Sequence, residues 1–224
     1  MLHILRRGQT ACQPEQPGPG WTISDDVLWI DLLKPTREEE LAVEAALGLQ
    51  LPTVEEMEAL EPSSRLYQEG GATFMTASLL AHGDNPPPFA TPATFVLAGG
   101  RLVTLRYETL KAFSIFQARA PEAGLTSGAG VLLSLLDAVV ERLAQVLDQT
   151  GDRVEGASFS IFQRPAAGDF RPMLTNLAQA QSITAITRTC LVSLARLLSF
   201  ASLAPEIADD GDHRAHLKLS LIHI

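Results

Sequence analysis

The sequence predicts an α/β protein in which a mixed sheet carries helices on both sides and is followed by long antiparallel helices. Partly β-branched apolar runs flank Gly99-Gly100, and similar runs surround Gly70-Gly71. Paired glycines adopt positive φ at little cost, so each pair predicts the turn of a β-hairpin. Near Val131 the pattern changes to apolar residues spaced three and four apart, which is typical of helices.

The strands beside Gly99-Gly100 are predicted at residues 94–97 and 102–105. Neither run alternates between polar and apolar residues, so we expect both faces of the sheet to be covered. The strands of the second hairpin are predicted at residues 65–68 and 73–80. We expect the sheet to contain both hairpins, with a helix starting near Thr36 on one side and the long helices on the other.

The N-terminal region offers weaker strand signals and one clear helix signal. Residues 21–23 and 27–30 are predicted as two short strands after a proline- and glycine-rich loop. Thr36 and Glu39 have the spacing of a capping box, and Gly48 is placed to end the helix that follows.

Acidic residues gather near the starts of this helix and of a second, short one that follows Thr53. They are Glu38, Glu39, Glu40, Glu55 and Glu56. They could ligate a metal, but carboxylates are also favoured at helix N-termini by the helix dipole. We favour the capping interpretation.

The second half is predicted to be helical. A short helix is expected at residues 110–118, and long helices at about 131–162 and 173–203, the last one stopped by Pro205. Gly151 and Gly156 weaken the first long helix and allow a break there. Two long helices with a short connection should pack antiparallel.

Three regions follow from this pattern. Residues 1–125 are predicted to form the α/β sheet domain, and residues 126–204 a long helical hairpin packed on it. Residues 205–224 form a tail. Its last part, residues 217–224, follows no established pattern and is interpreted as a strand fragment, a disordered end or partly non-native sequence.

Composition excludes some functions. The net charge of −9 argues against nucleic acid as a partner, because phosphate binding needs an excess of Lys and Arg. Cys12 and Cys190 are far apart and no CxxC occurs, which fits a reducing compartment. The N-terminus lacks the apolar core of a signal peptide, and no stretch reaches the roughly 18 apolar residues of a spanning helix. We therefore expect the chain as given to be soluble.

No motif for catalysis or phosphate cradling is present, so no enzyme activity is predicted. Two candidate cation sites remain. Asp84 lies in a proline-stiffened loop after a predicted strand. The tail group consists of Asp209, Asp210, Asp212 and His213. Carboxylates and imidazole suit hard or borderline cations such as Mg²⁺ or Zn²⁺, but a solvated tail is the alternative. His213 and His216 would have ligand spacing only on a helix, and none is predicted there.

Several stretches together resemble the cytoplasmic domain of CorA-type divalent-cation transporters, and within them the zinc-transporter branch called ZntB. The matching stretches are Trp29-Ile30-Asp31-Leu32, Pro35-Thr36, Glu38-Glu39, Pro62-Ser63-Ser64-Arg65, Thr94-Phe95-Val96-Leu97, Leu102-Val103-Thr104-Leu105-Arg106, Leu135-Leu136-Asp137 and Ser193-Leu194-Ala195-Arg196-Leu197-Leu198. Their order covers most of the chain up to about Leu203. The pore signature of the family, Gly-Met-Asn, does not occur in this chain.

This resemblance implies an α/β/α sandwich followed by long helices that lead to the membrane. It implies the cytoplasmic part of a homo-pentameric transporter, on the cytoplasmic side of the inner membrane, reached through segments downstream of this chain. The part would sense or accommodate divalent cations, Zn²⁺ or Mg²⁺, with Asp84 at the position of a regulatory acidic ligand. The alternative is a self-contained soluble binding or regulatory protein without a membrane part.

Overall fold

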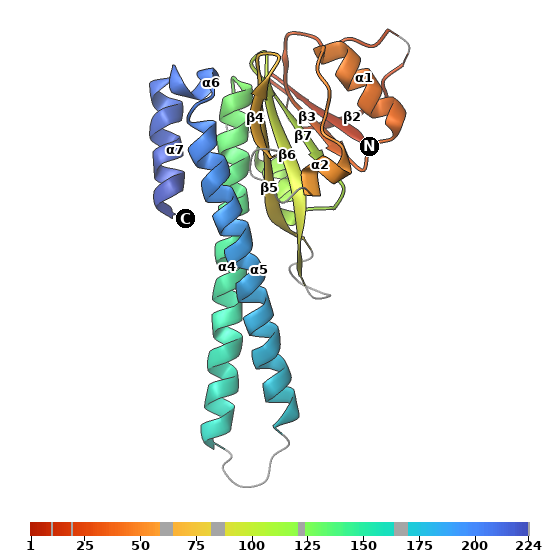
Figure 1. The fold of residues 1–224 in the computed structure, drawn as a ribbon. Coiled ribbons are helices and arrows are strands. Elements are labelled where there is room, and N and C mark those ends of the chain that lie inside the picture. The colour runs from red at the N-terminus through yellow and green to blue at the C-terminus, as the bar shows by residue number, and fades with distance from the viewer. Residues whose placement is uncertain are drawn as a thin grey trace.

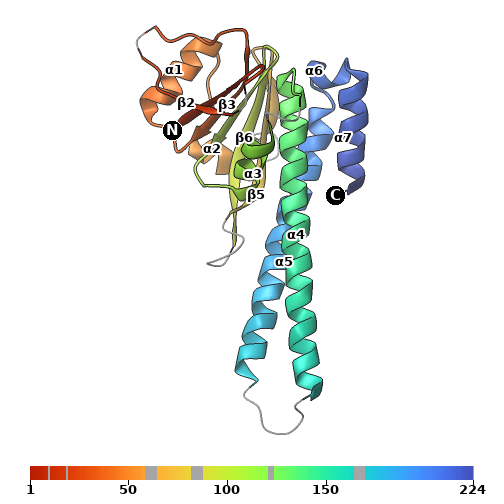
Figure 2. The same cartoon turned by 180° about the vertical axis from the view of Figure 1, so that it is seen from behind.

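The computed structural model describes residues 1–9, 11–18, 20–58, 65–81, 88–120, 124–163 and 170–223. Figures 1 and 2 show a sheet between two layers of helices, and a long helical hairpin that extends past one end of the sheet. The predicted α/β/α sandwich with long antiparallel helices is confirmed.

Within the described residues, strands join into one mixed sheet of order β2-β1-β3-β7-β6-β5-β4. They are β1 (Leu2–Arg6), β2 (Gln13–Glu15), β3 (Val27–Leu33), β4 (Leu66–Glu69), β5 (Ala72–Ala81), β6 (Phe89–Ala98) and β7 (Arg101–Arg106). The β3–β7 pair is parallel, and the other neighbours are antiparallel.

Both predicted hairpins are present, as β4–β5 and β6–β7. Gly99 and Gly100 have φ of 56° and 77°, the left-handed region that a side chain would make costly. Gly128 serves a different purpose, since an added Cβ would lie 2.3 Å from the backbone of Arg101. Its missing side chain lets the start of the first long helix reach the β6–β7 turn, where the Gly128 amide donates to the Gly100 carbonyl (2.8 Å).

One face of the sheet is covered by α1 (Arg37–Leu47) and α2 (Val54–Glu58). Val43 of α1 and Met57 of α2 are buried in a core that contains Ile30, Phe74 and Val96 from the sheet. The Thr36 helix therefore lies on the predicted side. Its capping box with Glu39 and its left-handed end at Gly48 are both present.

The opposite face is covered by α3 (Lys111–Arg119), α4 (Gly128–Gln163) and α5 (Arg171–Ala201). Trp29 and Phe95 of the sheet share this core with Phe113 of α3, Leu132 of α4 and Leu194 of α5. Two shorter helices follow, α6 (Pro205–Ala208) and α7 (Gly211–His223), and α7 runs beside α4.

Some expectations were wrong. Residues 21–23 form no strand. The edge of the sheet is built by β1 and β2, whose sequences are too short to show a strand pattern. α4 is continuous through Gly151 and Gly156, because the cost of two glycines is small against the rest of a 36-residue helix. α5 ends at Ala201, and Pro205 opens α6 instead of ending α5. Proline suits a first helical turn, where its missing amide hydrogen is not needed.

The tail differs most from its prediction. Residues 217–223 belong to helix α7, not to a strand, so a helix does carry His213 and His216. Leu217 is buried in the same core as residues of α4. This packing stabilises the helix, although the local sequence shows no helical pattern.

Candidate functional site

The candidate ligand Asp84 lies outside the described residues. The strand before it ends at Ala81, and Phe89, which starts the next strand, pairs with Ala81. A strand does precede Asp84 in the chain, as the sequence predicted. Its role as a ligand stays a prediction.

The tail group around Asp210 forms the junction between α6 and α7. Asp210 Oδ1 accepts hydrogen bonds from the amides of Asp212 (2.8 Å) and His213 (2.9 Å), so Asp210 caps α7. These amides, that of His213 above all, hold the pKa of Asp210 below its usual value. Asp209 and Asp212 are exposed.

The His213 ring lies between α6 and the start of α4. Its Nδ1 is 3.1 Å from the Glu206 carbonyl oxygen, and its Nε2 is 3.4 Å from Ser127 Oγ. Ser127 Oγ already accepts from the Gly130 amide (3.1 Å), so its proton is available for the ring. A cation at His213 would have to displace one of these contacts.

A second polar contact joins α7 to α4. Asp137 of α4 accepts a hydrogen bond from His216 Nε2 and another from Ser220 Oγ (2.7 Å). No sequence motif relates Asp137 to His216, and the one local signal is an aspartate directly after the apolar residues Leu135-Leu136. The contacts of Asp137 with α7, together with those of His213, hold α7 along the first half of α4.

The buried polar centre of the domain is Asp31 of β3, whose carboxylate is paired by Arg106 of β7. The guanidinium donates twice, Nη2 to Oδ2 (2.7 Å) and Nε to Oδ1 (3.0 Å). Thr104 Oγ1 donates to Oδ1 (2.8 Å) and Gln117 Nε2 to Oδ2 (3.2 Å). Trp29 Nε1 in turn donates to Thr104 Oγ1 (2.9 Å).

This network leaves the Asp31 carboxylate no open position for a ligand, so it is structural. Arg106 also stacks on the Phe113 ring, 4.4 Å from its centroid, which ties α3 to the sheet. Burial and the nearby Asp31 charge raise the pKa of Cys12 to about 12, so this thiol is protonated and unreactive at neutral pH. Two of the stretches that carry the family resemblance, around Trp29-Asp31 and Thr104-Arg106, meet in this network.

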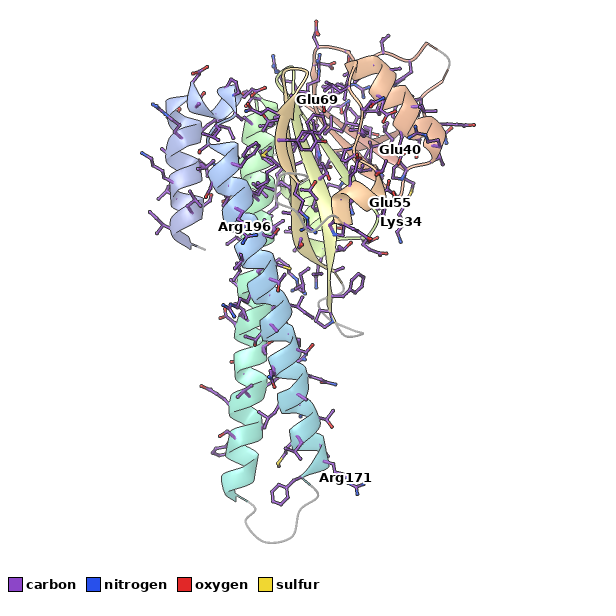
Figure 3. The ribbon with its side chains drawn as sticks, in the orientation of Figure 1. Lys34, Glu40, Glu55, Glu69, Arg171 and Arg196 are labelled. Carbon is purple, nitrogen blue, oxygen red and sulfur yellow. The ribbon has the colours of Figure 1, made fainter. Side chains whose placement is uncertain are left out.

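The acidic residues of α1 and α2 are largely used within the fold. Glu39 and Glu56 accept from the amides of Thr36 (2.9 Å) and Thr53 (2.8 Å), which confirms capping for these two. Burial tends to raise the pKa of Glu39, but hydrogen bonds from the Thr36 amide and the chain amino terminus outweigh it and lower that pKa. Glu40 and Glu55 line a 200 Å³ pocket on this face. Figure 3 labels both residues, Glu40 on α1 and Glu55 on α2.

Glu40 accepts a hydrogen bond from Tyr107 (2.9 Å) and pairs with Arg37 (3.0 Å). The pKa of Tyr107 is raised, mainly by burial and to a lesser extent by the hydrogen bond to Glu40. Across the described parts of the chain, no three His, Cys, Asp or Glu side chains converge as a metal site would require. The described acidic residues of α1 and α2 thus act as caps and ion-pair partners.

The sequence model of the family described as "CorA-like Mg2+ transporter protein" matches residues 24–223. The chain therefore belongs to the CorA-like family. The magnesium transport proteins CorA of Salmonella typhimurium and Escherichia coli K12 are each 28% identical to it over 177 residues. That alignment covers 78% of this chain and 56% of each relative, so the chain spans little more than half the length of these proteins.

Solved structures show the same fold. The soluble domain of CorA from Methanocaldococcus jannaschii superposes with a TM-score of 0.78 at 12% identity, covering 100% of this chain and 87% of that one. The ZntB cytoplasmic domain from Vibrio parahaemolyticus gives a TM-score of 0.62 at 13% identity, with coverages of 100% and 92%. The recognition of a CorA-type domain from sequence is confirmed, whereas the ZntB-like branch stays a prediction.

α5 is long and apolar enough to cross a membrane by length and composition alone, which the sequence analysis had not recognised. Its C-terminal half packs in the domain core, where Cys190, Leu194 and Leu197 are fully buried. A helix in a folded core passes the same test of composition, so this property alone assigns no membrane span.

Proposed function

We propose that this chain is the cytoplasmic part of a divalent-cation transporter, and that it senses or accommodates the cation. The observation that carries the proposal is the family match, which runs from before β3 to the end of α7. The relatives' name, magnesium transport protein, favours Mg²⁺ as the transported ion. Zn²⁺ is the ion expected if the chain belongs to the ZntB-like branch.

In this proposal the chain acts at the cytoplasmic side of the inner membrane and joins it through segments that follow α7. The contacts of Asp137 with His216, and of Ser127 with His213, connect α7 to α4. α4 in turn packs on the sheet through Leu132 and Leu135. A cation-dependent shift of the sheet domain would thus reach the helix closest to the membrane segments.

The experiment is an ion-flux measurement on the full-length protein in sealed lipid vesicles with a fluorescent Mg²⁺ or Zn²⁺ indicator inside. We expect entry of one of the two ions above that of empty vesicles. If neither ion enters although the protein folds and inserts, the transport proposal is overturned. A full-length protein that folds but does not insert favours the alternative, a self-contained soluble binding or regulatory protein.

The isolated chain is proposed to bind divalent cations weakly, with Asp84 as the best single candidate for a specific ligand. Calorimetry with Mg²⁺ and with Zn²⁺ on the parent, on Asp84→Ala and on the matched control Asp148→Ala tests this. Asp148 is an exposed aspartate of α4. Saturable binding that only Asp84→Ala abolishes supports the assignment. If binding is weak, unchanged in both variants and screened by salt, the cations are attracted by the acidic surface as a whole and Asp84 is not a specific ligand.

We also propose that the transporter is a pentamer, while this chain alone is a monomer or a weak oligomer. In this proposal, membrane segments downstream of α7 supply part of the contacts between subunits, so the chain alone keeps fewer contacts to stabilise an assembly. Sedimentation at micromolar concentration distinguishes the outcomes. A stable pentamer of this chain would show that the domain assembles by itself.

A further inference from the structure

A cavity of about 470 Å³ lies between the β4–β5 edge of the sheet and α5. Its lining includes Arg65 at the entry to β4, Ser78 of β5, and Arg188, Val192, Ser193 and Arg196 of α5. On α5, positions 188, 192 and 196 are spaced by four residues and therefore share one face of the helix. Figure 3 labels Arg196 on α5 beside the sheet, far from Arg171 at the other end of the same helix.

The charge of this cavity is opposite to that of the chain. Three arginines and, among the described residues, no carboxylate line it, although the whole chain carries a net charge of −9. Among the described residues, Arg188 and Arg196 take part in no ion pair or hydrogen bond, whereas Arg6, Arg37, Arg101, Arg106 and Arg119 all pair with acids. The positive charges of Arg188 and Arg196 are therefore available to a bound anion.

The cavity lining also contains hydrogen-bond donors, from Ser193 and Arg65. The Ser78 amide donates to Ser193 Oγ (2.9 Å), which uses one acceptor position of this hydroxyl and does not use its proton, so the hydroxyl can still donate. Arg65 is held in place by contacts of 3.4 Å from Nη1 to Ser78 Oγ and from Nη2 to the Glu58 carbonyl. The cavity therefore combines a positioned guanidinium, a hydroxyl donor and two further arginines on a packed helix.

We propose that this cavity is a binding site for a small soluble anion with at least two negative charges, of the phosphate or diphosphate class. Guanidinium groups match such anions because their N–H groups donate in pairs to phosphate oxygens. The volume is within the range of small-molecule sites. Because the ligand would contact both β5 and α5, its binding would stabilise the attachment of the long hairpin to the sheet.

The test uses the whole chain and pyrophosphate, with inorganic phosphate as the weaker probe, measured by calorimetry without divalent cations. Sodium chloride at equal ionic strength serves as the reference. We expect saturable binding of one pyrophosphate per chain, with a rise in melting temperature that chloride does not give. The double variant Arg188→Gln/Arg196→Gln should weaken binding by about tenfold or more, since each charge-assisted hydrogen bond is strong.

The matched control is Arg153→Gln, which removes an arginine charge from an exposed position of α4 that lines a different pocket. Both Arg188 and Arg196 are exposed, so their replacement should leave the fold intact, which circular dichroism verifies. The proposal is overturned if pyrophosphate does not saturate a site, or if Arg153→Gln weakens binding as much as the double variant. It is also overturned if the double variant alters only the oligomeric state, since the arginines would then contact another protein surface.

Discussion

The two halves of α5 carry similar apolar residues but have different surroundings. In the C-terminal half, Cys190, Leu194 and Leu197 are completely buried between the sheet and α4. In the N-terminal half, which extends beyond the sheet, Leu174 is 64% exposed and Leu177 is 38% exposed. The helical pattern predicts that a helix forms, but what covers its apolar face depends on elements far away in the sequence.

This difference indicates where the stability of the isolated chain resides. The sheet side has large buried aromatic rings and the Asp31–Arg106 pair, while in the described part of the chain the distal ends of α4 and α5 lie beyond the sheet. The exposed apolar residues of the distal part, Leu174 among them, therefore add little to the stability of the isolated chain.

The largest effect is expected from Asp31→Ala in the sheet side. It leaves the guanidinium of Arg106 buried without its partner, so the free energy of unfolding should fall by about 3–5 kcal/mol. Urea unfolding followed by circular dichroism measures this. The control is Glu141→Ala, which breaks an exposed pair with Arg119 and should cost less than about 1 kcal/mol. Equal losses in both variants would contradict the structural role of the buried pair.

A matched pair of substitutions compares the two halves of α5 directly. Leu194→Ala removes a fully buried side chain and should lower the free energy of unfolding by about 2–5 kcal/mol. Leu174→Ala, the same change at an exposed position, should alter it by no more than about 0.5 kcal/mol. A similar loss at Leu174 would mean that the distal hairpin is packed in solution, and the comparison would fail.

A smaller effect is expected at the start of α1. Thr36→Ala removes the side-chain acceptor of the capping box and should lower the free energy of unfolding by about 1 kcal/mol. Thr175→Ala is the control, because the Thr175 hydroxyl donates to the Arg171 carbonyl inside the exposed part of α5. Alanine favours a helix interior, so this control should be neutral or slightly stabilising. A loss at Thr175 as large as that at Thr36 would rule out capping as the cause.

The smallest effect is a pH dependence at Glu39. Its pKa is lower in the folded chain than in the unfolded one, so the ionised form stabilises the fold. That contribution is complete above the unfolded value of about 4.3 and is lost as the pH falls through the folded pKa. The melting-temperature difference between the parent and Glu39→Gln should therefore shrink from about pH 6 to about pH 3. A difference that stays constant over this range would show that ionisation of Glu39 is irrelevant.

The parts of the fold that the sequence predicted are those with local signals. Gly99-Gly100 indicated a hairpin, Thr36 and Glu39 a helix start, and the apolar spacing after Val131 a long helix, and all three are present. These signals depend on φ, on one or two hydrogen bonds, or on a regular spacing, and none of them needs information from distant residues.

What the sequence missed depends on distant partners. β1 is a strand because it pairs with β3, and α7 packs through Leu217, His213 and His216 against α4. The arginine-lined cavity joins Arg65 to Arg188 and Arg196 across more than a hundred residues, and no spacing in the sequence relates them. For the candidate cation site, the sequence proposed Asp84 and the tail acids, and the structure explains Asp210 as a cap without testing Asp84.

The central claim, that this chain is the cytoplasmic part of a membrane transporter, is tested most directly by sequencing the gene downstream of the codon for Leu217. The account predicts two apolar segments of about 20 residues, each long enough to span a bilayer, with Gly-Met-Asn between them. A reading frame that ends soon after α7, or that continues into a polar domain without such segments, would contradict it.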